Sequence, residues 1–350
     1  MSVSSGAVPD PLRLVLRELA AGRPLEPARV TDAFGVVMRG EATAVQTAAL
    51  LMGLRVQGED AATIAAVARA LRGAMVRLPA GDPASLVDTC GTGGGAIGTF
   101  NISTAAALVA AGAGARIAKH GNRSFTSRSG SADVLEALGV RADAPVAAMR
   151  RALDEAGIAF MYAPAMHPAM RHVGPVRREL GVPTVMNVVG PLANPAMAGR
   201  QVVGVADAAR APLIAGALAD LGGVHALVVH GEPGLDEVSP LGPTRVYEVR
   251  AGARAAEWVI DPGALGLAAK DAAELAGGEP HENARVVLDV LSGGGRPGAR
   301  AAVLLNAGAA VYVAGLERTY EAAVERARAA LDGGLGMRTL ARLRAAYAGA

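Results

Sequence analysis

The sequence has one cysteine, few aromatic residues and almost no net charge. Cys90 alone can form neither a disulfide within the chain nor a cysteine-ligated metal site, which suits a reducing compartment. Aromatic residues make up 3% of the chain against 45 glycines, and such small residues suit closely packed helices and a parallel sheet. A net charge of +2 gives no strong field for nucleic acid or an anionic membrane. We therefore expect no nucleic-acid and no membrane partner.

Long apolar runs are also absent. The longest, 301–316, contains Asn306 and is too short to cross a bilayer. Residues 1–19 lack the basic segment and apolar core of a signal peptide. With 51% hydrophobic and 19% charged residues, a chain of 350 residues is long enough for two folded domains. We therefore expect a soluble, cytoplasmic protein with two domains.

The distribution of apolar residues predicts an α/β fold that begins with a helical part. Four helical patterns precede a stretch rich in proline and glycine at 77–85, which marks the best candidate boundary. After it, short apolar runs alternate with helical patterns, as in a mostly parallel, buried sheet. We predict a small helical domain over 1–80, joined in space by helices from about 166–190, and a large α/β domain over 81–350.

The elements of the large domain follow from the same patterns. Strands are predicted at 86–89, 116–119, 158–161, 201–205 and 225–229, with one or two more within 240–262. Helices are predicted at 103–113, 131–138, 145–156 and 211–221, and then at 283–291, 299–315, 319–331 and 336–348.

The stretch 91–104, GTGGGAIGTFNIST, connects the first of these strands to a helix. Five of its first eight residues are glycine, which lets the backbone approach a ligand closely. Free N–H groups and the positive end of a helix together form an anion site, to which Thr99, Asn101, Ser103 and Thr104 add polar side chains. The stretch is neither a P-loop nor a dinucleotide-binding GxGxxG motif. An ordinary capped turn is the alternative.

A second polar stretch, KHGNRSFTS at 119–127, follows the next predicted strand. It combines the cations Lys119 and Arg123 with small polar residues. Open α/β sheets bind ligands at the carboxyl ends of their strands, so we expect the two stretches to face each other there. A pyrophosphate-bearing ligand would use both the cations and the small donors. A solvated basic loop, the alternative, would explain only the cations.

Two adjacent carboxylates follow the strand at 225–229. Asp236 and Glu237 lie just after this strand, where we expect the phosphate-binding loops. Magnesium prefers hard oxygen ligands and keeps several waters, so a pair of carboxylates beside phosphate groups suits it. The alternative is a pair of acids in a surface turn.

Basic residues gather at 166–178, MHPAMRHVGPVRR. We predict a helix from Pro168 that projects Arg171, His172 and the pair Arg177 and Arg178. Either arginine of that pair could hold a carboxylate through two parallel hydrogen bonds. His167 and His172 could act as acid or base, although such histidines are more often structural.

Four ordered motifs carry a family resemblance. GTGGGAIGTFNIST, KHGNRSFTSRSGSADVLEALGV, HPAMRHVGPVRRELGVPTVMNVVGPLANPA and GLDE resemble anthranilate phosphoribosyltransferase of tryptophan biosynthesis, and the similarity spans about 10–345. The resemblance implies a nucleoside phosphorylase/phosphoribosyltransferase-like fold, a homodimer formed through the helical domain, and a requirement for Mg²⁺. It also implies transfer of the phosphoribosyl group of 5-phosphoribosyl-1-pyrophosphate (PRPP) to the amine of anthranilate.

The resemblance further implies a role for each site residue. Arg177 would bind the carboxylate of anthranilate beside Asn122, and Gly91 would lie where the two substrates meet. No general base follows from the sequence, although His120 lies in the right loop. The expected Mg²⁺ ligands are Ser103, Asp236 and Glu237. The expected substrate contacts are Gly91, Gly94, Gly95, Thr99, Asn101, Ile102, Ser103, Thr104, Lys119, His120, Gly121, Asn122, Arg123, Ser124, Phe125, Thr126, Ser127, Ser131 and Arg177.

The sequence departs from the family pattern at three positions. Gly95 stands where the family commonly has aspartate, and we expect this to alter metal dependence while activity survives. Pro183 and Met186 replace a frequent arginine and phenylalanine, and should affect local packing. Two alternatives stay open: a nucleoside phosphorylase of the same fold, and a non-catalytic paralogue that binds nucleic acid through a basic face.

Overall fold

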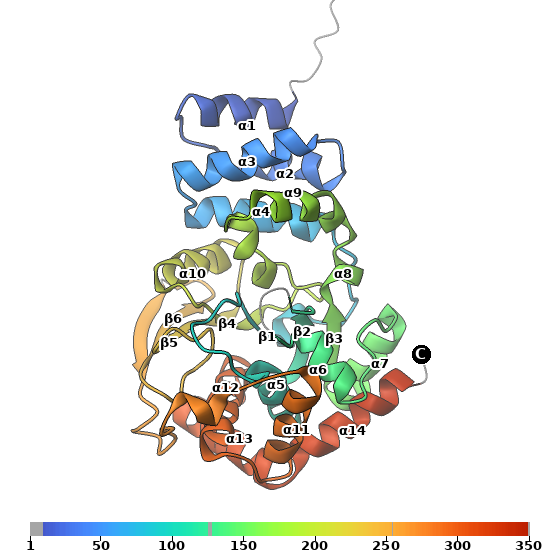
Figure 1. Ribbon diagram of the computed structural model, residues 1–350, viewed down its shortest axis with the longest axis vertical. Helices are drawn as coiled ribbons and strands as arrows, with labels where there is room; N and C mark the ends of the chain where they lie inside the picture. Colours follow the sequence, from blue (N-terminus) through green and yellow to red (C-terminus); the bar gives the residue numbers. More distant parts are fainter. Residues whose placement is uncertain (1–9, 125–127, 254, 349–350) are drawn as a thin grey trace, which may run out of the picture. The chain divides into compact units, whose positions relative to one another are not determined.

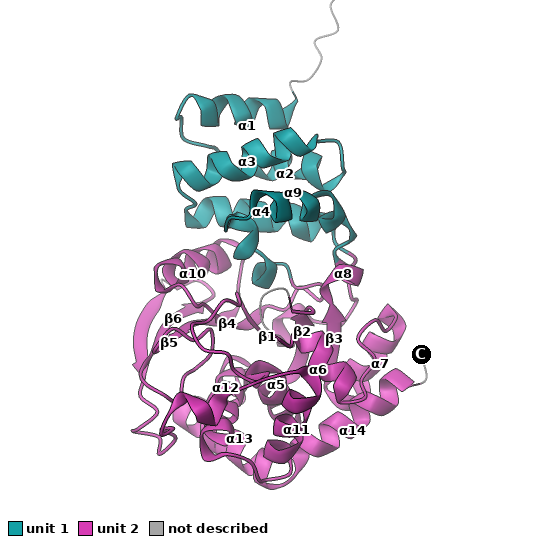
Figure 2. Ribbon diagram, viewed as in Figure 1, with its two compact units in different colours: residues 1–75, 167–193 teal, residues 76–166, 194–350 magenta. Residues whose placement is uncertain are grey.

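The computed structural model describes residues 10–124, 128–253 and 255–348. The chain forms two compact units (Figure 2), one made of residues up to 75 together with 167–193, the other of 76–166 together with 194–350. The first unit is entirely helical and the second is α/β. The N-terminal segment of the first unit ends at residue 75. The predicted helical domain ended five residues later, at residue 80, within the linker at 77–85.

Side-chain caps begin three of the four long helices of the first unit, and the helix at Pro27–Met38 begins without one. The Asp10 carboxylate accepts a hydrogen bond from Leu12 N (3.0 Å), and the Asp60 carboxylate accepts one from Thr63 N (2.7 Å). Thr43 forms a capping box at the start of the third helix. These caps satisfy N–H groups that the first turn of a helix leaves unpaired. The four helices are α1 (Pro11–Ala20), α2 (Pro27–Met38), α3 (Ala44–Gln57) and α4 (Ala61–Ala74).

Residues 167–193 add four short helices to this unit. The single helix predicted from Pro168 is wrong, because the chain forms a 3₁₀ turn and then a separate helix, α9. Pro175 has no N–H group to donate and cannot continue the preceding turn, although it fits the first turn of the new helix. The elements are η2 (Pro168–His172), α9 (Gly174–Leu180), η3 (Val185–Asn187) and η4 (Gly190–Leu192); α9 packs against α3.

A seven-stranded sheet forms the centre of the second unit (Figure 1). Its order is β3-β2-β1-β4-β5-β6-β7; the first five strands are parallel and the last two pair antiparallel. This confirms the predicted mostly parallel sheet. The strands are β1 (Leu86–Gly91), β2 (Arg116–Gly121), β3 (Ile158–Tyr162), β4 (Arg200–Gly204), β5 (His225–Gly231), β6 (Thr244–Arg250) and β7 (Ala256–Ile260).

Helices rich in small residues pack against this sheet. α5 (Ile102–Gly112) and α12 (Pro297–Val313) contact each other and β1, and most of their residues are buried. Gly308 of α12 lets Val324 approach so closely that an added Cβ would clash with it. The small residues therefore permit tight helix packing. The others are η1 (Pro83–Ser85), α6 (Ser131–Ala137), α7 (Val146–Ala156), α8 (Ala163–Met166), η5 (Ala208–Arg210), α10 (Ala211–Asp220), η6 (Ala272–Leu275), α11 (Pro280–Leu291), α13 (Tyr320–Asp332) and α14 (Leu335–Ala348).

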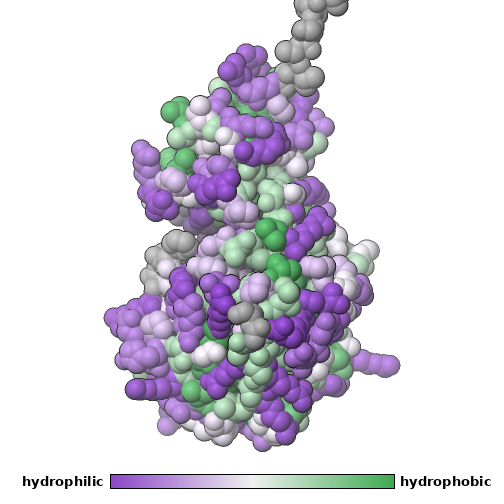
Figure 3. Space-filling model, turned by 90° about the vertical axis from the view of Figure 1, so that its right-hand side faces the viewer, coloured by the Kyte–Doolittle hydropathy of each residue, from purple (hydrophilic) through white to green (hydrophobic). Residues whose placement is uncertain are grey.

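The strand order reverses at β1. The chain runs from β1 through β2 to β3 on one side, then returns to place β4 on the other side of β1. Ligands bind outside the carboxyl ends of the strands at such a switch point, here between β1 and β4. Hydrophilic residues cover most of the face seen in Figure 3, with hydrophobic ones scattered among them. Over the described residues, every helix is too short or too polar to span a bilayer.

Candidate functional site

The glycine loop starts where β1 ends and leads into α5. Gly93 and Gly94 have φ values of 72° and 79°, a backbone conformation that glycine adopts without strain. Thr92 N donates to Gly204 O at the end of β4 (2.9 Å), and Gly93 N donates to Asp236 Oδ2 (2.8 Å). The loop therefore lies over the carboxyl ends of β1 and β4, at the switch point of the sheet.

Two glycines at these strand ends make room for Asp236. A Cβ on Gly204 would overlap the Asp236 carbonyl, and a Cβ on Gly91 would clash with the Asp236 carboxylate. The next residue, Glu237, accepts a hydrogen bond from Ser103 N in the first turn of α5 (3.1 Å). The structure thus brings both predicted carboxylates to the glycine loop and to the start of α5.

The site disfavours two negative charges on this pair of acids. Burial, together with the charge of Asp236, raises the pKa of Glu237 to about 8, while Lys119 opposes both effects. Burial also raises the pKa of Asp236, against the hydrogen bond from Gly93. A divalent cation would relieve this repulsion. The oxygens of Asp236, Glu237 and Ser103 are hard ligands that fit Mg²⁺.

The protein supplies only part of a coordination shell here. Among the described residues, no group of three or more His, Cys, Asp or Glu side chains could hold a metal ion. Magnesium commonly takes one or two carboxylates and completes its shell with water and substrate phosphates. A two-carboxylate site beside a phosphate loop is therefore the kind of site that suits Mg²⁺ with a phosphorylated substrate.

Lys119, on β2, reaches the end of β1 and the start of α5. Its buried ammonium donates to Thr89 O on β1 and lies 3.3 Å from Ser103 Oγ on α5. Burial lowers the pKa of Lys119, while the nearby carboxylates of Asp88 and Glu237 act in the opposite direction. The cation is thus held between β1, β2 and α5 and cannot swing freely in solvent.

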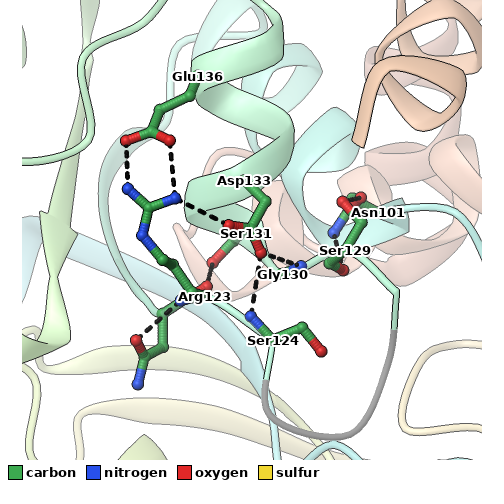
Figure 4. Close-up of polar contacts among 9 residues, drawn as sticks. Asn101, Arg123, Ser124, Ser129, Gly130, Ser131, Asp133 and Glu136 are labelled. Carbon is green, nitrogen blue, oxygen red and sulfur yellow. Dashed lines mark hydrogen bonds and ion pairs between the residues drawn. The ribbon is translucent and has the colours of Figure 1, made fainter. Parts of the chain in front are cut away.

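Asn101 joins the glycine loop to the loop that follows β2. Asn101 Nδ2 donates to Ser129 O (3.1 Å) and Ser129 Oγ donates to Asn101 Oδ1 (3.2 Å). Asn283 Nδ2, from α11, donates to the same Asn101 oxygen (3.0 Å). The convergence of the two stretches expected from the sequence is therefore present, and the Asn101–Ser129 contact appears in Figure 4.

The remaining substrate-contact candidates of the second unit occupy these two loops. Gly121 packs so closely on Ser131 that a Cβ would clash with its hydroxyl, and Ser131 Oγ donates to Asn122 O (3.2 Å). His120 is largely buried, and its N–H donates to Asp88 Oδ1 (3.0 Å). Thr99 forms a β-bridge with Ala276, and the side chains of Ile102 and Thr104 are buried. Gly95 lies beside Asp236, and both Arg123 and Ser124 donate hydrogen bonds to Asp133. Phe125, Thr126 and Ser127 lie outside the described residues.

Arg177 belongs to the first unit, on α9. Its guanidinium is partly buried, burial lowers its pKa, and it makes no ion pair or hydrogen bond with the described residues. Its neighbour Arg178 is exposed. A partly desolvated guanidinium without a carboxylate can bind an anion, because its donors are not already used. His167 is buried, and burial lowers its pKa to about 4, which keeps it neutral near pH 7.

Several buried polar residues position the site although the sequence patterns did not mark them as functional. Asp88 accepts hydrogen bonds from His120 N and from Asn194 Nδ2 (2.7 Å). Asn306, on α12, bonds both the N–H and the carbonyl of Val238 (2.9 Å each), directly after Glu237. A polar residue inside an apolar run, as at 301–316, is the one sequence signal that points to such a role.

Comparison with known proteins decides the family. Residues 83–337 match the model of the glycosyl transferase family, a/b domain, and residues 13–75 match that of the glycosyl transferase family, helical bundle domain. An anthranilate phosphoribosyltransferase from Rubrobacter xylanophilus is 50% identical over 331 residues, which cover 95% of this chain and 96% of the relative. The chain belongs to the anthranilate phosphoribosyltransferase family. It is therefore a glycosyltransferase of tryptophan biosynthesis, as the four motifs predicted.

Solved structures of anthranilate phosphoribosyltransferases share the fold. The crystal structure of the enzyme from Thermus thermophilus superposes with a TM-score of 0.90 at 42% identity, covering 95% of this chain and 99% of that one. The Saccharomyces cerevisiae enzyme in complex with PRPP and Mg gives a TM-score of 0.88 at 28% identity, covering 98% and 99%. These relatives support the transferase activity, and they lend no support to the phosphorylase or nucleic-acid-binding alternatives.

Proposed function

We propose that this chain transfers the phosphoribosyl group of PRPP to the amine of anthranilate. The products are N-(5-phosphoribosyl)anthranilate and pyrophosphate, and the reaction is the second step of tryptophan synthesis from chorismate. One observation carries the assignment to this site. Two polar loops joined through Asn101 and Ser129 lie beside the paired carboxylates Asp236 and Glu237, at the switch point of the sheet.

PRPP would bind along the two loops. Backbone N–H groups of the glycine loop, the N-terminus of α5 and the buried Lys119 present positive charge to phosphate oxygens. Ser103, Asp236 and Glu237 would hold Mg²⁺, which when bound neutralises charge on the pyrophosphate. The other proposed contacts are Gly91, Gly94, Gly95, Thr99, Asn101, Ile102, Thr104, His120, Gly121, Asn122, Ser124, Phe125, Thr126, Ser127 and Ser131.

The chemistry asks the protein mainly for positioning and electrostatic stabilisation. The amine nitrogen attacks C1 of the ribose, the C1–oxygen bond breaks with its electron pair leaving on pyrophosphate, and the nitrogen then releases a proton. Negative charge grows on the leaving group, where the donors of the glycine loop and Lys119 stabilise it. An aniline nitrogen is neutral at pH 7, so a strong base is not needed. We assign no general base; His120, the candidate in the second loop, is largely buried.

Anthranilate would be recognised through its carboxylate. We propose that Arg177 binds this group in bidentate fashion, with Asn122 beside the ring and Gly91 where the two substrates meet. The support is the partly buried Arg177 guanidinium, whose donors remain available within the described structure.

A second copy of the chain is the proposed partner of the helical unit, and the cytoplasm the proposed location. An open groove of about 390 Å³ runs between α1 and α3. Two valines of α3 are strongly exposed, Val45 by 79% and Val56 by 82%. A homodimer would remove this apolar surface from water. Residues that line the groove are Leu16, Leu19, Ala20, Gly22, Ala49, Gly53, Val56 and Gln57.

The activity is tested by mixing purified protein with anthranilate, PRPP and Mg²⁺ and following the loss of anthranilate fluorescence. Fluorescence should fall only when all three are present, and chelation of Mg²⁺ should stop it. Reactions without PRPP serve as the control. Phosphorolysis of thymidine, with no loss of anthranilate, would instead support the phosphorylase alternative.

A further inference from the structure

Arg123 makes its polar contacts with acids of its own unit. Its guanidinium forms a bidentate pair with Glu136 (2.6 and 2.8 Å) and a third bond with Asp133 Oδ1 (3.0 Å), as Figure 4 shows. Both acids lie on α6, directly after the loop that contains Arg123. The Arg123 guanidinium also lies over the ring of Tyr162, 5.7 Å from its centre. The side chain is therefore held on the protein from three directions.

Asp133 closes the neck of the same loop. Its Oδ2 accepts hydrogen bonds from Ser124 N (3.1 Å), where the chain enters the loop, and from Gly130 N (2.8 Å), where the chain leaves it. We call these two segments, 122–124 and 129–130, the neck of the loop. The two segments of the neck approach so closely that a Cβ on Gly130 would lie 2.6 Å from Asn122 O. Although burial alone would raise the pKa of Asp133, these hydrogen bonds and Arg123 hold it below its usual range. Asp133 thus stays ionised and holds Ser124 and Gly130 together through these two hydrogen bonds.

The local charge argues against phosphate binding by Arg123. One guanidinium faces two carboxylates, so the cluster of Arg123, Asp133 and Glu136 carries a net charge of −1. A phosphate approaching the guanidinium would meet both carboxylates, and like charges at such distances repel. The Lys119 ammonium, in contrast, contacts Thr89 on β1 and Ser103 in the first turn of α5.

We infer that Arg123 is a positioning residue, which Asp133 and Glu136 clamp so that Asn122, Ser124 and Ser131 keep the geometry that PRPP needs. This inference rests on the proposed function and revises the expectation that Arg123 touches the substrate. The clamp acts through the shape of the loop: Asn122 O accepts hydrogen bonds from both Ser131 Oγ (3.2 Å) and Ala132 N (3.1 Å).

The test compares Glu136→Gln, Arg123→Met and the double variant, measuring kcat and the KM for each substrate and PRPP binding by calorimetry. Because each single change breaks the same clamp, both should raise the KM for PRPP about 3- to 10-fold with kcat changed less than about 2-fold. The double variant should be no worse than Arg123→Met. Asp154→Asn is the control, since it removes an acid paired with Arg116 and Arg150 elsewhere in the unit.

The opposite pattern would overturn the inference. If Arg123 contacts phosphate, Glu136→Gln frees it, and the KM for PRPP should fall or stay unchanged while Arg123→Met raises it more than about 10-fold. Wild-type kinetics in both single variants would also overturn it. Failure of the wild-type protein to bind PRPP would overturn the proposed function itself and this inference with it.

Discussion

At the scale of single residues, Arg177 differs from the other described arginines because its charged group is partly buried and makes no ion pair or hydrogen bond with the described residues. Many arginines of the described chain pair with acids at the surface, where an ion pair contributes little to stability. Arg177 is partly buried and has no such partner within the described residues. A cation kept in this state costs stability, which makes ligand binding the simpler explanation.

Replacing Arg177 with alanine should weaken anthranilate binding selectively. Loss of a charge-assisted bidentate contact costs roughly 1.5–3 kcal/mol, so the KM for anthranilate should rise about 10- to 100-fold. The KM for PRPP should stay within about 2-fold. Arg178→Ala, at the exposed neighbouring position, is the matched control and should behave as wild type. An equal rise in both KM values for Arg177→Ala would mean that this residue does not select anthranilate.

Gly95 tests the electrostatics of the carboxylate pair. A Cβ at this position would lie 3.3 Å from Asp236 Oδ1, and its backbone suits an L-residue because its φ is not positive. Gly95→Asp would add a third carboxylate beside two that already repel each other. We expect tighter Mg²⁺ binding, seen as half-maximal activity at about 3- to 10-fold lower Mg²⁺ and a larger Mg²⁺-induced rise in Tm.

Gly98→Asp provides the control for this change. Gly98 is exposed in the same loop, and a Cβ there would contact nothing within 4 Å. It adds the same charge away from Asp236 and should leave the Mg²⁺ profile near that of wild type. Identical profiles for Gly95→Asp and the wild type would show that position 95 does not influence the metal.

At the scale of elements, local patterns predicted more of the fold than of the site. The five parallel strands were predicted because apolar runs that end in glycine or polar residues are a local signal. The prediction of one continuous helix from Pro168 was wrong because Pro175 begins a separate helix, α9. The contacts of Asp88 and Asn306 could not be predicted, since each joins segments from different parts of the chain, 68 residues apart for Asn306 and Val238. Such pairs depend on the packed fold rather than on neighbouring residues.

Asn306 shows how a helix positions the site. Its amide bonds Val238 N and Val238 O, fixing the segment that carries Asp236 and Glu237 against α12. Asn306→Ala would leave these buried backbone groups unpaired, at a cost of about 2–4 kcal/mol in the free energy of unfolding. We also expect a higher Mg²⁺ requirement in kinetic assays. Urea unfolding measures the first effect, and wild-type values for both stability and Mg²⁺ dependence would contradict this role.

At the scale of the whole molecule, buried histidines should make stability depend on pH. His167 is 7% exposed and its pKa is lowered to about 4, chiefly by burial. Burial also lowers the pKa of His225, with the partner Glu248 acting in the opposite direction. A histidine with a lowered pKa binds its proton more weakly in the folded state than in the unfolded state. Stability is therefore unaffected above about pH 6.5 and falls as the pH drops below it.

The expected loss can be measured for His167 alone. Between pH 7 and pH 5 its contribution should lower the free energy of unfolding by about 2 kcal/mol, from its pKa of about 4 against 6.5 in the unfolded chain. His167→Asn removes this titration, so urea unfolding of the variant at the two pH values should show a correspondingly smaller loss than wild type. His281→Asn, at an exposed position, should keep the wild-type loss. If His167→Asn loses as much stability as the wild type, the acid sensitivity arises elsewhere in the molecule.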